Sequence, residues 1–417
     1  MHNEPSRPAA SHWQLIALLT AVLMISYVDR GNLATAAPLI QKELGFNEAQ
    51  IGFLASAFYW TYVTMMFPAG WATERFGAHR VLAVGVLLWA VATLLTGFVG
   101  GAATILVLRL LLGVGESPVF PASSSLLATH VPRDRLGGAN GIISFGYLVG
   151  PAIGTWIGGL MMARVGWRPV FILFGALSLV WIVPWLRYTR ATAAAAAAPP
   201  ALVQGAPSSW RILRERGLWG AALGHFSSNY NWYFILTFLP LYLVNKRGMS
   251  MVEMGEVGGG AYLINAVASV AAGLYTDRWI RLGRSPTVIY KLIMVTNHVV
   301  SIAAMAGMVL LPLPQSLFCL YAYQVFLGLS SPGVFGIGQI LAGPLATGRW
   351  IGIQNCLGNL SGIIAPALGG LLIVWNGGDY TYAFGVVCLV NLLGIVGWGL
   401  ILPKVEPVDW AKGAARV

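Results

Sequence analysis

Charged side chains are scarce in this chain of 417 residues, since Asp, Glu, Lys and Arg together make up only 9%. Soluble domains carry about 25% charged residues, so the composition excludes an ordinary soluble protein. The hydrophobic fraction is 57% and the mean hydropathy is +0.72. Such a composition is typical of a protein that crosses a lipid bilayer many times.

The chain also lacks the short motifs of common enzymes. It has no HExxH, no GxSxG and no dinucleotide-binding glycine pattern. Residues 343–350 imitate a phosphate-binding loop but lack its Lys and its Ser or Thr, so we interpret them as a turn between two spans. The three cysteines all lie in apolar runs, which predicts neither a disulfide nor a metal site. We therefore expect no enzyme, no cofactor and no metal, and the absence of a long soluble domain disfavours a ligand sensor.

What the sequence has instead is a series of long apolar runs. Runs of about 20 residues or more, separated by short polar breaks, predict transmembrane helices. Twelve such spans are expected, at 14–37, 49–72, 79–98, 102–128, 137–163, 167–188, 217–244, 251–275, 286–310, 314–342, 348–374 and 380–402.

The basic residues predict the orientation of these spans. Cytoplasmic loops retain Lys and Arg, and with the N-terminus inside, the 25 basic residues divide into eighteen inside, five outside and two within spans. We therefore expect a multi-pass membrane protein with both termini in the cytoplasm. The net charge of +11 then comes from basic residues in the cytoplasmic loops, so it predicts no nucleic-acid partner.

A polar segment divides the chain into two similar halves. We expect an N-terminal six-helix bundle at 1–188, a linker with a short interfacial helix at 189–216, and a C-terminal six-helix bundle at 217–417. The repeated segments GWATER and GLYTDR begin at Gly70 and Gly273. Parallel six-helix halves are typical of a transporter that rocks around a central site. The predicted fold class is therefore an all-α membrane protein with twelve helices in two pseudo-symmetric halves.

Four ionisable residues lie where spans should carry none: Asp29, Arg30, Arg109 and Glu116. Each costs roughly 2.5–3.5 kcal/mol at a helix centre, which favours a functional role. Asp29 and Arg109 are predicted to lie at the same depth in the membrane, so we expect them to form an ion pair. The alternative role of this pair is purely structural, to stabilise the fold. Arg30 then faces a cavity and binds a carboxylate. Asp29 and Glu116 are the expected proton-coupling acids, and Glu116 is favoured because it lies farther from its predicted arginine.

Several of these segments resemble a known family. Residues 70–80 resemble the loop signature of the major facilitator superfamily, with Glu74 where Asp is commoner, and residues 109–116 resemble its fourth-helix motif. Residues 26–33 resemble the first helix of its anion:cation symporter family, which includes galactonate and hexuronate transporters. The resemblance implies the major facilitator fold and, from members that are proton symporters, proton coupling by the corresponding acids.

Candidate substrate contacts come from the resemblance and from spacing. Sugar-acid transporters of this family place tyrosines and an asparagine at positions similar to Tyr27, Tyr62 and Asn355. In the seventh span, polar residues recur every four positions and form one stripe. Any of these polar groups could instead bridge helices. The full set of expected substrate-binding residues is Arg30, Tyr27, Tyr62, Asn355, Arg109, Tyr59, Asn229, Tyr233 and Gln339.

The sequence thus predicts a proton-coupled symporter, acting as a monomer, that takes up a small organic anion such as a hexonate or hexuronate. Tyr147 stands where galactonate-type transporters carry a glutamine, so a small aromatic carboxylate is the alternative. An exporter of drugs or metabolites with the same fold is a third hypothesis. The repeated loop residues are expected to act in gating and packing, and they are Glu74, Arg75, Asp277 and Arg278.

Overall fold

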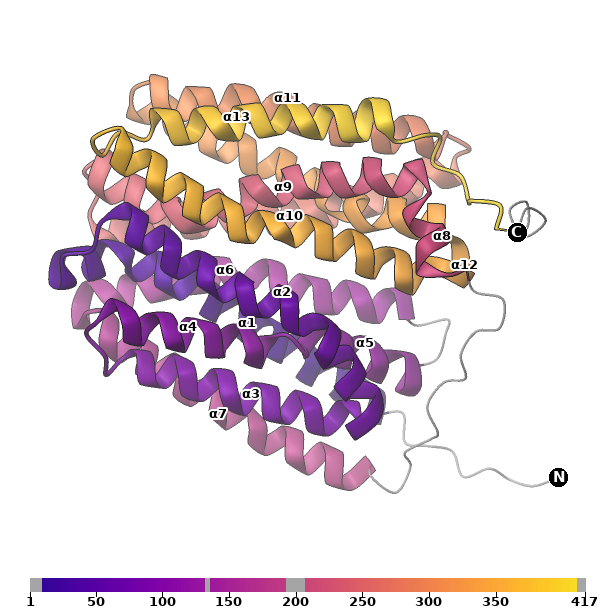
Figure 1. Ribbon diagram of the computed structural model, residues 1–417, viewed down its shortest axis with the longest axis horizontal. Helices are drawn as coiled ribbons and strands as arrows, with labels where there is room; N and C mark the ends of the chain where they lie inside the picture. Colours follow the sequence, from indigo (N-terminus) through magenta and orange to yellow (C-terminus); the bar gives the residue numbers. More distant parts are fainter. Residues whose placement is uncertain (1–9, 132–135, 193–206, 411–417) are drawn as a thin grey trace. The chain divides into compact units, whose positions relative to one another are not determined.

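The computed structural model describes residues 10–131, 136–192 and 207–410 (Figure 1). Contacts between helices divide the chain into two compact units. Unit 1 comprises Met1–Gly45, Ala57–Ala201 and Met251–Gly259. Unit 2 comprises Phe46–Ser56, Leu202–Ser250 and Gly260–Val417. The bundle boundaries expected from the sequence, at 188 and 217, stay a prediction.

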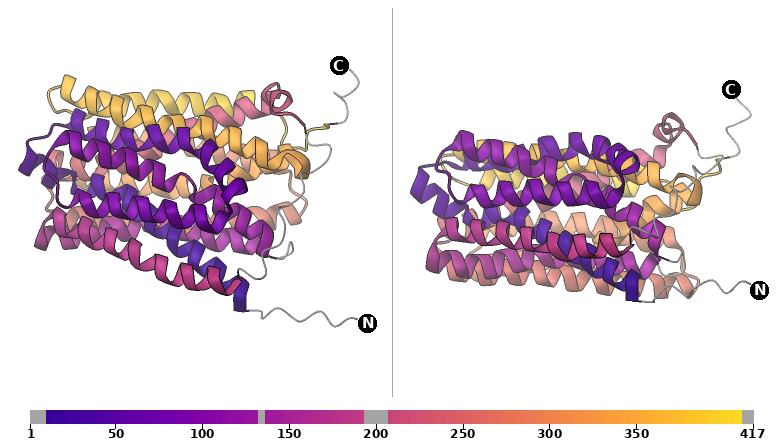
Figure 2. Two further views of the ribbon diagram at one scale, coloured as in Figure 1. Left: turned by 60° about the horizontal axis from the view of Figure 1, so that its bottom comes forward. Right: turned by 90° about the horizontal axis from the view of Figure 1, so that it is seen from below.

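Long helices form the described part of unit 1. α1 packs against α6 and α7, and α3 packs against α4 and α7. The indigo to magenta helices of this unit run roughly along one direction (Figure 2). The helices that lie wholly or largely in this unit are α1 (Ala10–Leu44), α2 (Glu48–Phe76), α3 (Ala78–Thr96), α4 (Ala102–Glu116), α5 (Val119–His130), α6 (Leu136–Val165) and α7 (Trp167–Thr192).

Unit 2 is built in the same way around α9 and α12. α12 packs against α9 and α11, and α11 lies beside α13 (Figure 1). The short helix predicted in the linker is present as α8, and its role at a membrane surface stays a prediction. The bounds are α8 (Ser209–Leu213), α9 (Arg216–Leu241), η3 (Tyr242–Lys246), α10 (Met251–Arg281), α11 (Pro286–Leu310), α12 (Leu313–Trp375), α13 (Thr381–Ile395) and η4 (Val396–Ile401).

Each predicted span lies mainly on helical residues. By length and composition, ten helices in the described part of the chain can cross a membrane, with α12 contributing two of them. The remaining predicted spans coincide with α2 and α9, which are 29 and 26 residues long. The fourth span is interrupted between α4 and α5 at Ser117 and Pro118. Pro118 has no backbone N–H to continue the helical hydrogen bonds of α4.

Gly343 bends α12 between its two spans. Its φ of 61° and ψ of 178° are open only to glycine, and they break a helix that otherwise runs for 63 residues. The break frees carbonyl oxygens, and the C-terminal segment caps two of them. Val408 N donates to Leu341 O at 2.8 Å, and Trp410 Nε1 donates to Ala342 O at 2.8 Å. The turn predicted over residues 343–350 is thus reduced to the bend at Gly343, because residues 344–350 are helical.

Two glycines let the helices of unit 1 approach closely enough to build its interior. A Cβ on Gly113 of α4 would collide with the backbone of α2 at Phe58. A Cβ on Gly150 of α6 would lie 2.7 Å from Met24 O and 2.8 Å from Tyr27 Cβ on α1. Small residues are the usual means of close helix packing in membranes. Here they bring α1, α2, α4 and α6 together around the charged residues.

Candidate functional site

Arg30 and Glu116 form an ion pair in the interior of unit 1. Arg30 lies on α1 and Glu116 ends α4, and Arg30 Nε donates to Glu116 Oε2 at 2.7 Å. Their side chains are 2% and 0% exposed. Ser26, one turn before Arg30, donates to the same Oε2 at 2.7 Å. The structure therefore buries a charge pair that links the first span to the fourth.

This ion pair uses only part of its hydrogen-bonding capacity. Arg30 Nη2 and Glu116 Oε1 are both buried, and neither has a hydrogen-bond partner among the described residues. A guanidinium and a carboxylate can form two parallel hydrogen bonds, and this pair forms one. Arg30 therefore keeps a donor that another carboxylate could use.

Aromatic rings surround the Arg30 guanidinium. Its Cζ lies 4.4 Å from the ring centroids of both Tyr27 and Tyr62, and 5.2 Å from that of Phe58. The Tyr59 ring meets Phe58 and Tyr62 edge-on, at 4.8 and 6.4 Å between centroids. The structure thus gathers the three tyrosines expected at the substrate site next to the arginine expected to hold the anion.

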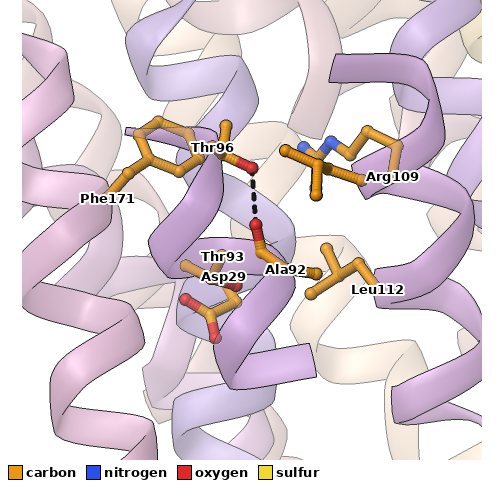
Figure 3. Close-up of a pocket in the computed structure, with 8 residues that line it drawn as sticks. Asp29, Ala92, Thr93, Thr96, Arg109, Leu112 and Phe171 are labelled. Atoms are coloured by element: carbon orange, nitrogen blue, oxygen red, sulfur yellow. Dashed lines mark hydrogen bonds between the residues drawn. The ribbon is translucent and has the colours of Figure 1, made fainter. Parts of the chain in front are cut away.

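Asp29 and Arg109 line a separate small cavity in unit 1 (Figure 3). Its volume of about 10 Å³ gives room for about one water molecule. Asp29 accepts hydrogen bonds from Asn32 at 3.1 Å and from Ser178 at 3.4 Å. Arg109 reaches in from α4 (Figure 3) and forms no ion pair or hydrogen bond within the described residues. The other lining residues are Ala92, Thr93, Thr96, Leu108, Leu112 and Phe171.

The expected ion pair between Asp29 and Arg109 is therefore wrong, because within the described residues these two charges lie at one cavity without pairing. Consecutive residues on a helix differ by about 100° in direction. Asp29 accordingly faces Ser178 on α7, whereas Arg30 faces Glu116 on α4. Glu116, expected to lie farther from an arginine than Asp29 does, is in contact with Arg30.

In unit 2, an asparagine links two of the expected contact residues. Tyr233 OH on α9 donates to Asn359 Oδ1 on α12. Asn359 Nδ2 in turn donates to Asn355 Oδ1 at 2.9 Å and to Asn355 O at 2.8 Å. Asn229 is half-buried on α9, and Gln339 is exposed on α12. Tyr233 and Asn355 thus belong to one polar cluster, and its connecting residue, Asn359, was not expected from spacing.

A second polar network in unit 2 joins three helices. His298 Nδ1 on α11 donates to Asn391 Oδ1 on α13 at 2.7 Å. Asn391 and Asn231 of α9 exchange two amide hydrogen bonds at 2.8 and 2.9 Å. All three side chains are fully buried. His298 therefore bridges α11 to α13 within unit 2.

The repeated loop residues lie near helix ends, away from the charged interior of unit 1. Arg75 is exposed near the end of α2, and Arg278 is exposed near the end of α10. The side chains of Glu74 and Asp277 lie outside the described part of the structure. Their roles in gating stay predictions. Among the described residues, no group of three or more His, Cys, Asp or Glu side chains could hold a metal ion.

Sequence reasoning missed the small polar residues that hold the buried acids. Ser26 fixes Glu116, and Ser178 and Asn32 contact Asp29. Serines are common in membrane helices, so their presence alone carries little information. The only local signal was spacing, since Ser26 and Arg30 are four residues apart on one face of a helix.

The chain matches the Major Facilitator Superfamily over residues 19–347. It is similar to the D-galactonate transporter of Escherichia coli, with 28% identity over 97% of this chain and 98% of that protein. It is also similar to the probable galactarate/D-glucarate transporter of Bacillus subtilis, with 27% identity over 92% of both chains. Among solved structures, a D-xylose-proton symporter superposes with a TM-score of 0.76, 12% identity and coverage of 95% and 99%.

These matches agree with the long apolar helices and the buried charges. The solved structure establishes the fold, and the family match covers both the first span, which bears Arg30, and the fourth, which bears Glu116. The protein is a multi-pass membrane transporter and not an enzyme. The chain belongs to the major facilitator superfamily.

Proposed function

We propose that this transporter couples the uptake of a small organic anion to protons by alternating access, and that a sugar acid such as a hexonate or hexuronate is its substrate. The single observation that carries the proposal is the ion pair of Arg30 with Glu116, in which one guanidinium donor stays unused. A substrate carboxylate and Glu116 then compete for the same cation.

Protonation of Glu116 decides that competition. When Glu116 is ionised, it neutralises Arg30, and the site has little attraction for an anion. When Glu116 takes up a proton, the Arg30 charge is uncompensated in a buried place, where charge interactions are strong. A substrate carboxylate then restores neutrality through charge-assisted hydrogen bonds. Because linkage is reciprocal, a bound anion strengthens proton binding by the same factor.

Asp29 and Arg109 form the second half of the proposed coupling. They lie at one cavity without an ion pair, so each charge depends on surrounding dipoles for its stabilisation. A proton on Asp29 removes its negative charge and leaves Arg109 uncompensated, which adds to the attraction for an anion. We therefore assign Asp29 and Glu116 as the proton-binding groups, and Arg30 and Arg109 as the cations that favour the anion.

The choice of substrate rests on the relatives and on the neutral polar groups. Two similar proteins are named for D-galactonate and for galactarate and D-glucarate, which are hydroxylated carboxylates. Hydroxyl and amide groups suit such a substrate. We assign as further contacts Tyr59, Asn229, Tyr233, Asn355 and Gln339.

A small aromatic carboxylate is the second candidate, and one contact favours it. The Tyr147 ring lies 5.2 Å from Tyr27 and 6.2 Å from Phe120, and all three residues are half-buried. This aromatic surface begins next to Arg30. In both cases we expect a monomer in the bacterial inner membrane, with both termini in the cytoplasm and Glu74, Arg75, Asp277 and Arg278 acting at the gates.

The test is a thermal-shift screen of the purified protein, followed by transport in liposomes. D-Galactonate, D-glucarate and benzoate are compared at pH 5.5 and pH 7.5. A ligand that binds only the folded state raises its melting temperature. We expect one anion to stabilise the protein, more strongly at pH 5.5, and its influx to drive proton uptake. Proton uptake in Glu116→Gln that stays at the wild-type level would refute the coupling, and stabilisation by uncharged sugars alone would refute the substrate class.

A further inference from the structure

Two tyrosine rings from different helices hold the Arg30 guanidinium. Tyr27 on α1 and Tyr62 on α2 each place a ring centroid 4.4 Å from Arg30 Cζ. A guanidinium within about 6 Å of an aromatic centroid is attracted by the negative face of the ring. We call these two rings the aromatic clamp. No hydrogen bond joins either hydroxyl to Arg30 or Glu116 within the described residues.

Neighbouring rings fix both members of the clamp. Tyr147 on α6 lies 5.2 Å from Tyr27, and Gly150, one turn later, lets α6 approach Tyr27 Cβ. Phe58 stacks on Tyr62 at 5.3 Å between centroids, with 19° between the ring planes. The rings are therefore held by contacts that do not involve Arg30, and they can determine where the guanidinium lies.

The clamp accounts for the single hydrogen bond between Arg30 and Glu116. A guanidinium free to rotate would align with the carboxylate and form two parallel bonds. Here Nε reaches Oε2, while Nη2 and Oε1 stay unpaired although both are buried. Rings that hold the guanidinium in place can prevent that alignment. Arg30 is then bound to Glu116 less tightly than it could be, and its remaining donor stays ready for an anion.

We propose that Tyr27 and Tyr62 are positioning residues, which act on the anion through Arg30 with their rings rather than by hydroxyl contacts with the substrate. This inference rests on the proposed function, because it assumes that Arg30 exchanges Glu116 for a substrate carboxylate. Losing a clamp ring lets Arg30 turn toward Glu116 and form the second hydrogen bond. Glu116 then competes better, and the anion binds more weakly.

Phenylalanine and leucine substitutions separate the ring from the hydroxyl. Tyr27→Phe and Tyr62→Phe keep the ring, so D-galactonate affinity at pH 7.5 should stay within about twofold of wild type. Tyr27→Leu and Tyr62→Leu remove the ring, and each should weaken affinity by about 2- to 30-fold, the range of a cation–π contact. Benzoate replaces D-galactonate if only benzoate stabilises the wild type. Tyr230→Leu removes a tyrosine of unit 2 that is as buried as Tyr62, and it should leave the affinity unchanged.

The same leucine substitutions made in the Glu116→Gln variant test whether the rings act through the ion pair. In Glu116→Gln, no carboxylate competes for Arg30, so the leucine substitutions should cost much less affinity than in the wild type. Equal losses in both backgrounds would overturn the proposal, because they indicate a general packing defect. A loss in the phenylalanine variants as large as in the leucine variants would overturn it in favour of hydroxyl contacts. If the wild type binds neither anion at any pH, the proposed function itself fails, and the positioning role fails with it.

Discussion

The two units bury different kinds of polar side chain. Among the described residues, the buried Asp, Glu and Arg side chains all lie in unit 1, and they are Asp29, Arg30, Arg109 and Glu116. Unit 2 buries neutral groups instead, in the network of Asn231, His298 and Asn391 and in the cluster around Asn359. The two units thus differ in the charge of the polar side chains that they bury.

This difference indicates a division of labour. A buried charge costs far more than a buried amide, so it is retained where it has a function. The charges of unit 1 can exchange protons and bind an anion. In unit 2, the network of Asn231, His298 and Asn391 pairs amide and imidazole groups with one another and ties α9, α11 and α13 together. We therefore expect substitutions in unit 1 to alter coupling, and substitutions in the unit 2 network to alter stability.

The largest effect is expected at Arg30. Arg30→Gln removes the anion-binding cation and leaves Glu116 buried without its partner, at a cost of about 3–5 kcal/mol in stability. Transport should be lost and the melting temperature lowered. The double variant Arg30→Gln with Glu116→Gln serves as the control, because it restores a neutral interior. It should recover stability but not transport, and recovered transport would contradict the role of Arg30.

A smaller effect, on stability alone, is expected in unit 2. Asn391→Leu leaves Asn231 and His298 buried without their shared partner, which costs about 1–3 kcal/mol for each unsatisfied group. Chemical denaturation should report this loss, while the pH dependence of anion binding in the folded fraction stays as in the wild type. A changed pH dependence of anion binding with unchanged stability would contradict the division of roles between the two units.

Trp410 should contribute less to stability than the buried network. Trp410→Phe keeps most of the ring but removes the hydrogen bond to Ala342 O at the bend of α12. The expected loss is about 0.5–1.5 kcal/mol. Tyr380→Phe, which removes a buried polar group from the same unit without touching the bend, is the matched comparison. A larger loss in Tyr380→Phe would show that the cap at Gly343 contributes little.

The smallest effect is expected for an exposed ion pair. Lys246 Nζ lies 2.6 Å from Asp379 Oδ2, and this bond together with those from Thr381 lowers the pKa of Asp379 to about 2. Because the pKa of Asp379 is lower in the folded protein than its unfolded value of about 3.9, the ionised carboxylate stabilises the folded state at pH values above about 3.9. This stabilisation is lost as the pH falls toward 2. Both side chains are more than a third exposed, so the contribution is below about 1 kcal/mol. Asp379→Asn should leave melting and transport between pH 5.5 and pH 7.5 unchanged, and a large shift would show that solvent screens this pair less than expected.

The sequence predicted the helices and the buried charges well, because long apolar runs and the cost of a charge in lipid are strong constraints. It predicted the ion pair wrongly. Depth along a span gave Asp29 and Arg109 the same level, but depth does not say which neighbouring helix a side chain faces. The rotation of α1, set by its packing on α6 and α7, decides that Arg30 meets Glu116.

The contacts of the supporting polar residues could not be predicted from the sequence either. Ser26 and Asn359 became recognisable only once their partners on other helices were known. Gln339 was expected at the site as an amide in the tenth span; its side chain is exposed on α12, and its role as a substrate contact stays a prediction. A single helical pattern identifies a polar face, whereas its partner depends on tertiary packing.

The most direct test of the central claim is the number of protons taken up when the anion binds. Purified protein in weak buffer with a pH indicator is mixed with the stabilising anion near neutral pH. Competition between Glu116 and the anion for Arg30 predicts a measurable uptake of protons by the wild type and a smaller uptake by Glu116→Gln. Binding of the anion to the wild type without any proton uptake would contradict the account.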